Sequence, residues 1–517
     1  MISADRKYAH RSLPATEQLL VAGGDARIAL DEEGLNKYGC PPVPDPDLVA
    51  LGSSTASSIS TMGYGAADSL RNRLLQAEGS GSDADIYAHE IRRIRREFIR
   101  LCGVTGVHGL DVVFAASGTD LHLLAAQLAG AADAVPMLAI TVGALETGRG
   151  VPSALAGRHF SSRAALGDAV IEDEPIFGGG GIEVAAVPIR RDDGTPRAAA
   201  DIDADFEVVA TRAVRSGLRV LLVLADVSKS GMVAPSPACA LALRRKLPQA
   251  VDVLVDACQF RFAPDTLRAY LELGFMVALT GSKFVTGPPF SGALLIPEQA
   301  ASRLRGRPLP RALAAYSTRA DWPEDWDTSA LPGNIANFGL LLRWEAALAE
   351  LRAFRALPEA GIAHFLEEFA RAIRQRLAGN TVFEPLPVPP LDRSSLECAT
   401  GWDHIQTIFP FLLFRSTEGN GRQPLNREQT MRIYRLLQRD VSERDGPPTL
   451  TALRCQMGQP VACGNRGGVP VSALRLCASA RLVVEGTAHG GRDAHAVIGK
   501  ALAALDKTAL LVQSGGY

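Results

Sequence analysis

The chain has 517 residues, of which 47% are hydrophobic and 21% charged, and its 54 basic and 56 acidic side chains leave a net charge of −2. This length exceeds the size at which single cores stop growing, so more than one domain is expected. A nearly neutral chain has no overall field that would attract nucleic acid or an anionic membrane, which favours a small-molecule partner.

The N-terminus and the cysteines indicate a cytoplasmic protein. The opening residues, MISADRKYAHRS, lack the apolar core of a signal peptide, and no apolar run is long enough to span a bilayer. The eight cysteines are scattered without a C-x-x-C pair, and we expect them to be reduced thiols. The spacing of Cys and His gives no reason to expect a zinc site.

The first strong periodic signal is an amphipathic helix over 84–102, whose apolar residues share one stripe: Ile86, Ile91, Ile94, Phe98 and Leu101. Short apolar runs follow, separated by helix-like segments, and they begin at residues 111, 136, 220, 251, 275 and 292. Continuous runs, rather than alternating ones, favour strands that are covered on both faces. The pattern predicts a mainly parallel α/β sheet sandwiched by helices.

Two stretches help to divide the chain. FGGGGIEV, over 177–184, lacks G-x-G-x-x-G spacing and predicts a turn before a strand. The segment 307–334 is rich in proline and aromatics and is followed by the strong helix pattern IANFGLLLRWEAALAELRAF. We therefore expect an N-terminal segment of loops over 1–85, a large domain over 86–325 and a smaller α+β domain over 326–517.

The first candidate site follows the apolar run that begins at Asp111. In DVVFAASGTDLHLLAAQLAG, Ser117, Gly118 and Thr119 stand between a strand and a helix expected to open at Asp120. Backbone N–H groups at a helix start, two hydroxyls and a glycine that permits close approach form a phosphate cradle. Serine and threonine are also common N-caps, so a purely structural role stays open.

A second candidate is Asp256, at the end of the buried strand expected in VDVLVDACQF. A carboxylate in that position is costly unless a cation meets it. A protonated pyridine nitrogen would serve, and so would a salt bridge to Arg261. The residue pattern leaves both partners open.

The third candidate is Lys283, in LTGSKFVTGPPFSGALLIP, where a cation follows an apolar run. Burial disfavours an ammonium, and a neutral amine is the form that attacks an aldehyde to make a Schiff base. Alternatively, the side chain extends past Phe284 to water. A phosphate cradle, a carboxylate for a pyridinium and an imine-forming amine, taken together, are what pyridoxal 5′-phosphate requires.

On these residues the sequence resembles the fold-type-I pyridoxal-phosphate enzymes, and within them the class V aminotransferase and cysteine desulfurase group. The match runs from about residue 85 to 350 and resumes near 450 to 485. It implies a mainly parallel, seven-stranded-type sheet sandwiched by helices, with a smaller α+β C-terminal domain. By analogy it also implies a homodimer.

The resemblance assigns roles to residues at the strand ends. Thr280-Gly281-Ser282-Lys283, followed by a Gly-Pro pair, matches the family's lysine motif, with Lys283 as the imine lysine. Lys229 is a rival but precedes Asp256, contrary to the family order. The implied cofactor-binding set is Ser117, Gly118, Thr119, Glu146, Thr147, Ser228, Asp256, Gln259, Thr280, Ser282 and Lys283.

Other positions are less settled by the resemblance. Glu146 and Thr147 stand where the family places a ring-stacking side chain, and His159 downstream is either a substitute or a core residue. Near the C-terminus, SALRLCASARLV resembles the strand with the arginine that pairs with the substrate α-carboxylate, which points to Arg475, with Arg481 as second candidate.

Two more features are weighed against plainer interpretations. Cys463 lies near, but offset from, the position of the nucleophilic cysteine of desulfurases, and we favour a structural role. The polar loop GSSTASS, over 52–58, either shapes substrate choice or is a connector, and we favour the connector slightly.

These residues predict an enzyme that binds an amino acid and removes its α-proton, with Lys283 as the base. We select transamination, which makes the protein an aminotransferase. The alternative is a lyase that cleaves a C–S bond or carries out another β-elimination, because both reactions share the first step. A pyridoxal-phosphate-binding protein without turnover is a further possibility.

Overall fold

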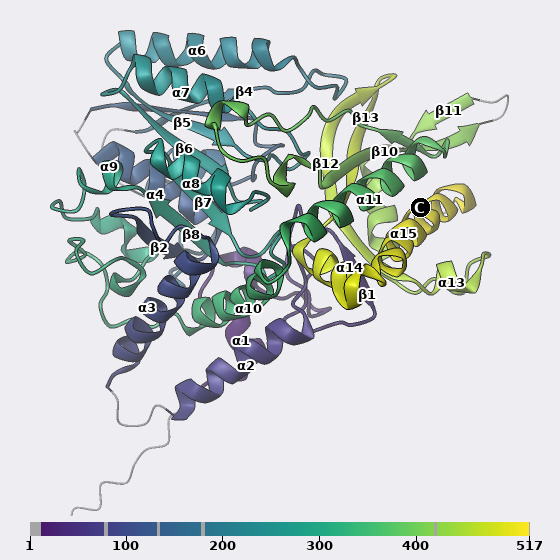
Figure 1. The fold of residues 1–517 in the computed structure, drawn as a ribbon, viewed down its shortest axis with the longest axis horizontal. Helices are drawn as coiled ribbons and strands as arrows, with labels where there is room; N and C mark the ends of the chain where they lie inside the picture. Colours follow the sequence, from purple (N-terminus) through teal and green to yellow (C-terminus); the bar gives the residue numbers. More distant parts are fainter. Residues whose placement is uncertain (1–11, 77–80, 132–134, 177–180, 418–420, 516–517) are drawn as a thin grey trace, which may run out of the picture.

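Two sheets, each covered by helices, organise the chain in the computed structural model (Figure 1). The structure describes residues 12–76, 81–131, 135–176, 181–417 and 421–515. The first four residues of the FGGGGIEV stretch lie outside these ranges, and the strand expected after it is present. Among the described helices, none is long and apolar enough to cross a bilayer. The cytoplasmic location stays a prediction.

The larger sheet has the strand order β2-β8-β7-β6-β5-β3-β4. Strand β8 runs antiparallel to both of its neighbours, and the other six strands point in one direction. The bounds are β2 (Asp111–Ala115), β3 (Met137–Val142), β4 (Glu183–Val187), β5 (Arg219–Ala225), β6 (Val251–Ala257), β7 (Met276–Thr280) and β8 (Gly292–Ile296). The carboxyl ends of six strands therefore meet at one edge.

The continuous apolar runs are the reason why this sheet is covered on both faces. Every residue of β2, β3, β5, β6, β7 and β8 is buried, whereas the edge strand β4 is partly exposed. Separate apolar clusters cover the two faces. The flanking helices are α3 (Asp83–Leu101), α4 (Gly118–Ala131), α5 (Val151–Leu155), α6 (Ala199–Arg215), α7 (Pro237–Lys246), α8 (Pro264–Glu272) and α9 (Glu298–Ala301).

Helix α3 confirms the expected amphipathic helix, because all five residues of its predicted apolar stripe are buried. Helix α4 begins at Gly118 rather than at Asp120. Gly118 and Thr119 thus belong to its first turn, which brings the Thr119 hydroxyl to the helix N-terminus, where backbone N–H groups lack partners.

The second sheet has the order β1-β12-β13-β10-β11, with β9 paired to β10. Its strands are β1 (Leu48–Leu51), β9 (Phe383–Pro385), β10 (Ile408–Thr417), β11 (Gly421–Pro424), β12 (Arg454–Arg466) and β13 (Val469–Cys477). The surrounding helices are α11 (Glu359–Ala378), α12 (Arg427–Leu437), α13 (Pro448–Thr451), α14 (Ala480–Gly491) and α15 (Ala494–Ser514). An apolar core lies between this sheet and its helices.

The N-terminal segment belongs to both parts of the molecule. Strand β1 pairs in parallel with β12, while α1 (Thr16–Leu20) and α2 (Thr61–Gln76) pack against the long buried helix α10 (Phe338–Arg355). Helix α2 has no counterpart in the sequence-based prediction. The boundaries expected near residues 85 and 325 stay a prediction.

Candidate active site at the carboxyl edge of the large sheet

A cavity of about 700 Å³ opens at the carboxyl edge of the seven-stranded sheet. We call "sheet wall" the cavity residues at the ends of its strands, chiefly Ser117, Gly118, Thr119, Asp256 and Lys283. We call "outer wall" the cavity residues from the N-terminal segment and the second sheet, chiefly Arg27, Tyr38, Thr55, Gln459 and Arg475. The two walls join segments that lie far apart in the sequence.

The predicted cradle lies at the N-terminus of α4, and a guanidinium faces it. Arg27 donates hydrogen bonds to Ser117 Oγ and Thr119 Oγ1, both at 3.1 Å. A Cβ at Gly118 would lie 2.8 Å from Cys258 Sγ, so only glycine leaves the cradle this shape. Two hydroxyls, a helix N-terminus and an arginine are groups that bind phosphate.

Arg27 is held in place by several neighbours. It forms a salt bridge with the buried carboxylate of Asp25 and lies between the rings of Phe160 and Phe290, at 5.7 and 5.4 Å from their centroids. Burial opposes the charge, but Tyr38 and Asp25 outweigh it and raise the pKa of Arg27. The guanidinium therefore stays charged and fixed beside the cradle.

Asp120, in the first turn of α4, is a buried carboxylate close to this cradle. Its Oδ2 accepts a hydrogen bond from Ser117 Oγ, and its Oδ1 is buried without a partner among the described residues. Burial, together with the charge of Asp25, raises the pKa of Asp120 to about 7. Near neutral pH the group thus divides between its neutral and its charged form.

Asp256, the last residue but one of β6, lies at the cavity and is paired with a histidine that the sequence alone did not suggest. His122 Nε2 lies 3.2 Å from Asp256 Oδ2, and His122 Nδ1 lies 2.7 Å from the carbonyl oxygen of Gly118. Arg261, the alternative partner, instead donates to Thr407, to the carbonyl oxygen of Ala478 and to other groups.

Asp256 and His122 each stabilise the charged form of the other. Burial raises the pKa of Asp256, but the charge of His122, whose Nε2 lies 3.2 Å away, and the charge of Lys283 lower it below its usual range. Conversely, burial works against the charge of His122, and Asp256 outweighs it and raises the histidine pKa. The carboxylate is therefore ionised inside the cavity, where it can meet a cationic ring nitrogen.

Lys283 lies in the loop after β7 and lines the same cavity as Asp256. Three predicted neighbours also line it, namely Gln259, Thr280 and Ser282. The Gln259 amide donates to the carbonyl oxygen of Ser54, and Thr280 Oγ1 donates to that of Cys258. The predicted lysine and aspartate thus share one cavity.

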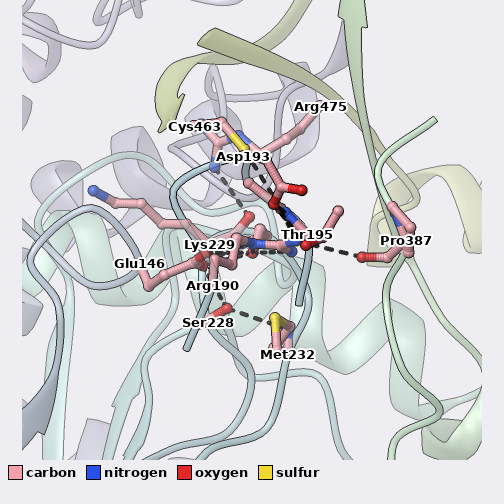
Figure 2. A network of polar contacts seen from close by, with 12 residues as sticks. Glu146, Arg190, Asp193, Thr195, Ser228, Lys229, Met232, Pro387, Cys463 and Arg475 are labelled. Carbon is pink, nitrogen blue, oxygen red and sulfur yellow. Dashed lines mark hydrogen bonds and ion pairs between the residues drawn. The ribbon is translucent and has the colours of Figure 1, made fainter. Parts of the chain in front are cut away.

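A polar network around the Glu146 carboxylate adjoins the cavity (Figure 2). The predicted site residues Glu146, Thr147 and Ser228 lie in this network, in the cavity lining, or in both. Glu146 lines the cavity, but its carboxylate is bound by Arg190 at 2.9 Å and by the hydroxyls of Ser228 and Ser230. Ser228 therefore points at Glu146 and lies outside the cavity lining. Thr147 lines the cavity, and its buried hydroxyl has no partner among the described residues.

The two candidate arginines have different surroundings. Arg475, on β13, lines the cavity and donates to Thr55 Oγ1 at 2.9 Å and to the carbonyl oxygens of Gln459 and Lys229. Arg481 instead binds Glu350 and two carbonyl oxygens outside the cavity lining. The geometry favours Arg475 over Arg481 for contact with a ligand.

The remaining candidates lie away from the cavity or at its rim. Cys463 is buried against the carbonyl oxygen of Gly194, and burial raises the pKa of its thiol, as fits a structural cysteine. His159 bonds to and stacks on Tyr316 outside the lining. Within the polar loop, residues 54–56 line the cavity, so the loop is part of the site rather than a plain connector.

The residues present fit pyridoxal phosphate. The cradle offers hydroxyls and a guanidinium to a phosphate, the ionised Asp256 offers a partner to a pyridinium, and Lys283 offers an amine to an aldehyde. The unpartnered hydroxyl of Thr147 adds a donor that no protein group uses within the described residues.

The sheet order, with its single reversed strand and a site at the strand ends, is that of fold type I of the pyridoxal-phosphate-dependent enzymes, and the predicted fold is confirmed. One solved structure with this fold is the cysteine desulfurase CsdA from Escherichia coli, in its S-sulfonic acid form. It matches with a TM-score of 0.51 and 14% identity, over 90% of this chain and 96% of its own.

Two further solved structures match with lower TM-scores. A NifS-like protein from Rickettsia africae ESF-5 gives 0.49 at 12% identity, over 90% of this chain and 100% of its own. The apo cysteine desulfurase from Thermococcus onnurineus NA1 has a TM-score of 0.48 at 13% identity, and the match covers 88% of this chain and 95% of that structure's chain. No protein-family model and no curated protein matches the sequence. At 14% identity, the likeness to CsdA bears on the fold alone.

Proposed function

We propose that this protein is a pyridoxal-phosphate-dependent enzyme that acts on an amino acid. The observation that carries the proposal is the meeting of Lys283, the ionised Asp256 and the Ser117–Thr119 cradle in one cavity. Each of these groups has a plainer explanation by itself. Their convergence from three different strand ends supports a common ligand.

Different residues hold different parts of the cofactor. Ser117, Thr119, Arg27 and the N-terminus of α4 bind the phosphate, Asp256 meets the ring nitrogen, and Lys283 binds the aldehyde carbon. When bound, pyridoxal phosphate supplies an aldehyde for an amino group and a protonated ring that accepts the electron pair left on the α-carbon.

Two residues act on the amino acid or on its proton, and a third acts through Asp256. Arg475 binds the α-carboxylate, because a guanidinium matches a planar anion with two donors. Lys283 takes the α-proton, since its amine lines the cavity beside Asp256. His122 is a positioning residue, because it fixes Asp256 and keeps it ionised.

For the reaction itself we propose a lyase that eliminates a substituent from the β-carbon, with C–S bond cleavage as the leading case. Support comes from the fold shared with a cysteine desulfurase, which favours this alternative over the transamination selected from the sequence. Sulfur transfer to Cys463 is not part of the proposal, because that thiol is buried outside the cavity lining.

Transamination remains the second candidate, because it shares the α-proton step carried out by Lys283.

A homodimer is part of the same proposal, by analogy with the resemblance described above. Light scattering of the purified protein tests it, and a monomeric mass would contradict it.

The first experiment identifies the lysine that binds the cofactor. The purified protein is incubated with pyridoxal phosphate, reduced with borohydride and digested, and the modified peptide is mapped by mass spectrometry. We expect the adduct on Lys283 in the wild-type protein. In Lys283→Ala we expect no adduct on the remaining candidate, Lys229. An adduct on Lys229, or no visible absorbance band in the wild-type protein, contradicts the proposal.

The second experiment distinguishes the two reactions by their products. With cysteine and other amino acids carrying a β-leaving group, a lyase releases the substituent, ammonia and the keto acid that remains, and it regenerates the aldehyde absorbance. An aminotransferase forms a keto acid that still carries the substituent and leaves the cofactor in its amine form. Accumulation of the amine form without release of the substituent would replace the lyase by the aminotransferase.

A further inference from the structure

Lys229, which follows β5, places a second amine in the cavity that the proposed reaction does not use. Its backbone is fixed from two sides, because its N–H donates to the carbonyl oxygen of Glu146 at 2.8 Å and its carbonyl oxygen accepts from Arg475 at 3.3 Å. Figure 2 shows the side chain extending away from the Glu146 network. Its Nζ has no hydrogen-bond partner within the described ranges, and the residue lines the cavity.

The acidic groups around Lys229 are committed elsewhere. Glu146 is bound by Arg190 and by two serine hydroxyls, and Asp256 is bound by His122. The other charges that face Lys229 are those of Arg475, on β13, and Lys283, in the loop after β7. Lys229 thus lies among cations without a carboxylate of its own.

Arg475 is in the same situation. Its guanidinium donates to neutral acceptors, which are one hydroxyl and two carbonyl oxygens. Its Nε is buried and has no partner in the part of the chain that the structure describes. Two cations therefore line the same cavity, linked by the hydrogen bond from Arg475 to the Lys229 backbone, and neither has a carboxylate partner among the described residues, which is costly until an anion arrives.

The surroundings also set the charge of Lys229 before a ligand binds. Burial, followed by the charges of Arg475 and Lys283, lowers the pKa of Lys229 to about 7. Near neutral pH the amine therefore alternates between its charged and neutral forms. An anion beside it favours the charged form, so binding of that anion and protonation of Lys229 are linked.

We propose that Lys229 and Arg475 form a subsite for an amino acid whose side chain carries a second negative charge, and that Lys229 takes up a proton from solvent when this ligand binds. The inference rests on the proposed function, because it assigns the α-carboxylate to Arg475. That assignment leaves Lys229 for the side-chain anion. A neutral amino acid would balance only one of the two cations.

The cavity mouth has charges of the same sign. Lys37, Arg149 and Arg427 are exposed at the lining, against one exposed carboxylate among the described lining residues, Glu172. Such an excess raises the local concentration of anionic ligands. The charges at the mouth and those in the interior therefore both favour anionic ligands.

The first test measures the binding of matched ligand pairs to the protein loaded with pyridoxal phosphate. The shift of the protein's visible absorbance reports the binding. The pairs are aspartate and asparagine, glutamate and glutamine, and O-phosphoserine and serine. We expect at least about tenfold tighter binding of the anionic member, as for a charge-assisted hydrogen bond. The pair with the largest ratio identifies whether the anion is a carboxylate or a phosphate.

Lys229→Met removes the charge and keeps the length of the side chain, and we expect it to abolish this ratio while leaving the affinity for the neutral member within about threefold. The matched control is Lys246→Met, because Lys246 is exposed and pairs with Glu207 on the surface. Equal affinities within all three pairs for the wild-type protein would overturn the proposal, as would an unchanged ratio in Lys229→Met.

The second test counts protons by calorimetry in buffers of different ionisation enthalpy. With the favoured anionic ligand at pH 7, we expect greater proton uptake by the wild-type protein than by Lys229→Arg, which stays charged, because burial and the neighbouring cations lower the pKa of Lys229 to about 7. Equal uptake by the wild-type protein and Lys229→Arg would overturn the proposal.

The outcomes separate this proposal from the one on which it rests. If the wild-type protein shows no cofactor absorbance band, the proposed function fails. If the band is present and the two members of every ligand pair bind with equal affinity, the function stands and the subsite fails. Should Lys229→Met not fold, the wild-type ratios and the proton count with Lys229→Arg still decide.

Discussion

The two walls of the cavity differ in how their charges are balanced. On the sheet wall, the ionised Asp256 is matched by His122, and both groups come from elements of the same sheet domain. On the outer wall, Arg475 donates to neutral groups, and Arg27 reaches across to the hydroxyls of the sheet wall. Asp256 thus has a cationic partner within its own domain, whereas the Arg475 guanidinium has no carboxylate partner among the described residues.

The largest effect is expected from a change in the sheet wall. Asp256→Asn keeps the size of the side chain but removes the charge that stabilises a protonated ring nitrogen. We expect the cofactor to remain attached through Lys283 while kcat falls by about 100-fold or more, as for the loss of a preorganised electrostatic partner. Stopped-flow absorbance of the loaded variant measures the α-proton step.

The matched control for this change is Asp265→Asn, which removes a half-exposed carboxylate at the start of α8. It should leave kcat unchanged. If Asp256→Asn retained the wild-type rate, Asp256 would have no part in the chemistry, and the balanced pair on the sheet wall would be purely structural.

An intermediate effect is expected where the two walls meet. Arg27→Gln keeps a donor for the cradle but removes the charge, and we expect the affinity for pyridoxal phosphate to fall by roughly tenfold because a charge-assisted hydrogen bond is lost. Fluorescence titration with the cofactor measures this. Arg92→Gln, which alters an exposed arginine paired with Glu324, is the control. Loss of kcat without loss of affinity would place Arg27 at the substrate instead.

The smallest effect concerns Asp120 and depends on pH. Because the pKa of Asp120 is raised to about 7, the carboxyl is neutral below that pH and charged above it, where it repels a phosphate. We expect the cofactor affinity of the wild-type protein to fall a few-fold as the pH rises through 7. Asp120→Asn should lose this component of the pH profile. A profile identical in both proteins would show that Asp120 does not sense the phosphate.

The sheet wall could be predicted from the sequence because its residues follow buried strands directly. Ser117, Asp256 and Lys283 each stand at or just after the end of an apolar run, and parallel strands bring such positions to one edge. Ser228 obeys the same rule and yet turns its hydroxyl to Glu146, because strand-end position does not fix where a side chain points.

The outer wall could not be predicted in this way. Arg27 lies in GGDARIAL, a stretch without periodicity or motif, and it reaches the cradle through contacts between distant segments. His122, on the sheet side, did carry a signal, since it is a single imidazole in an otherwise apolar stretch of helix one turn after the cradle. A charged histidine buried there would need an acid, and Asp256 was a carboxylate whose partner the residue pattern had left open.

The pairing of β1 with β12 has a consequence for how the protein is made. Residues 48–51 are synthesised long before their partner strand, residues 454–466. Strand β1 therefore stays unpaired until that strand has been made, and its pairing is a long-range contact that forms late in folding.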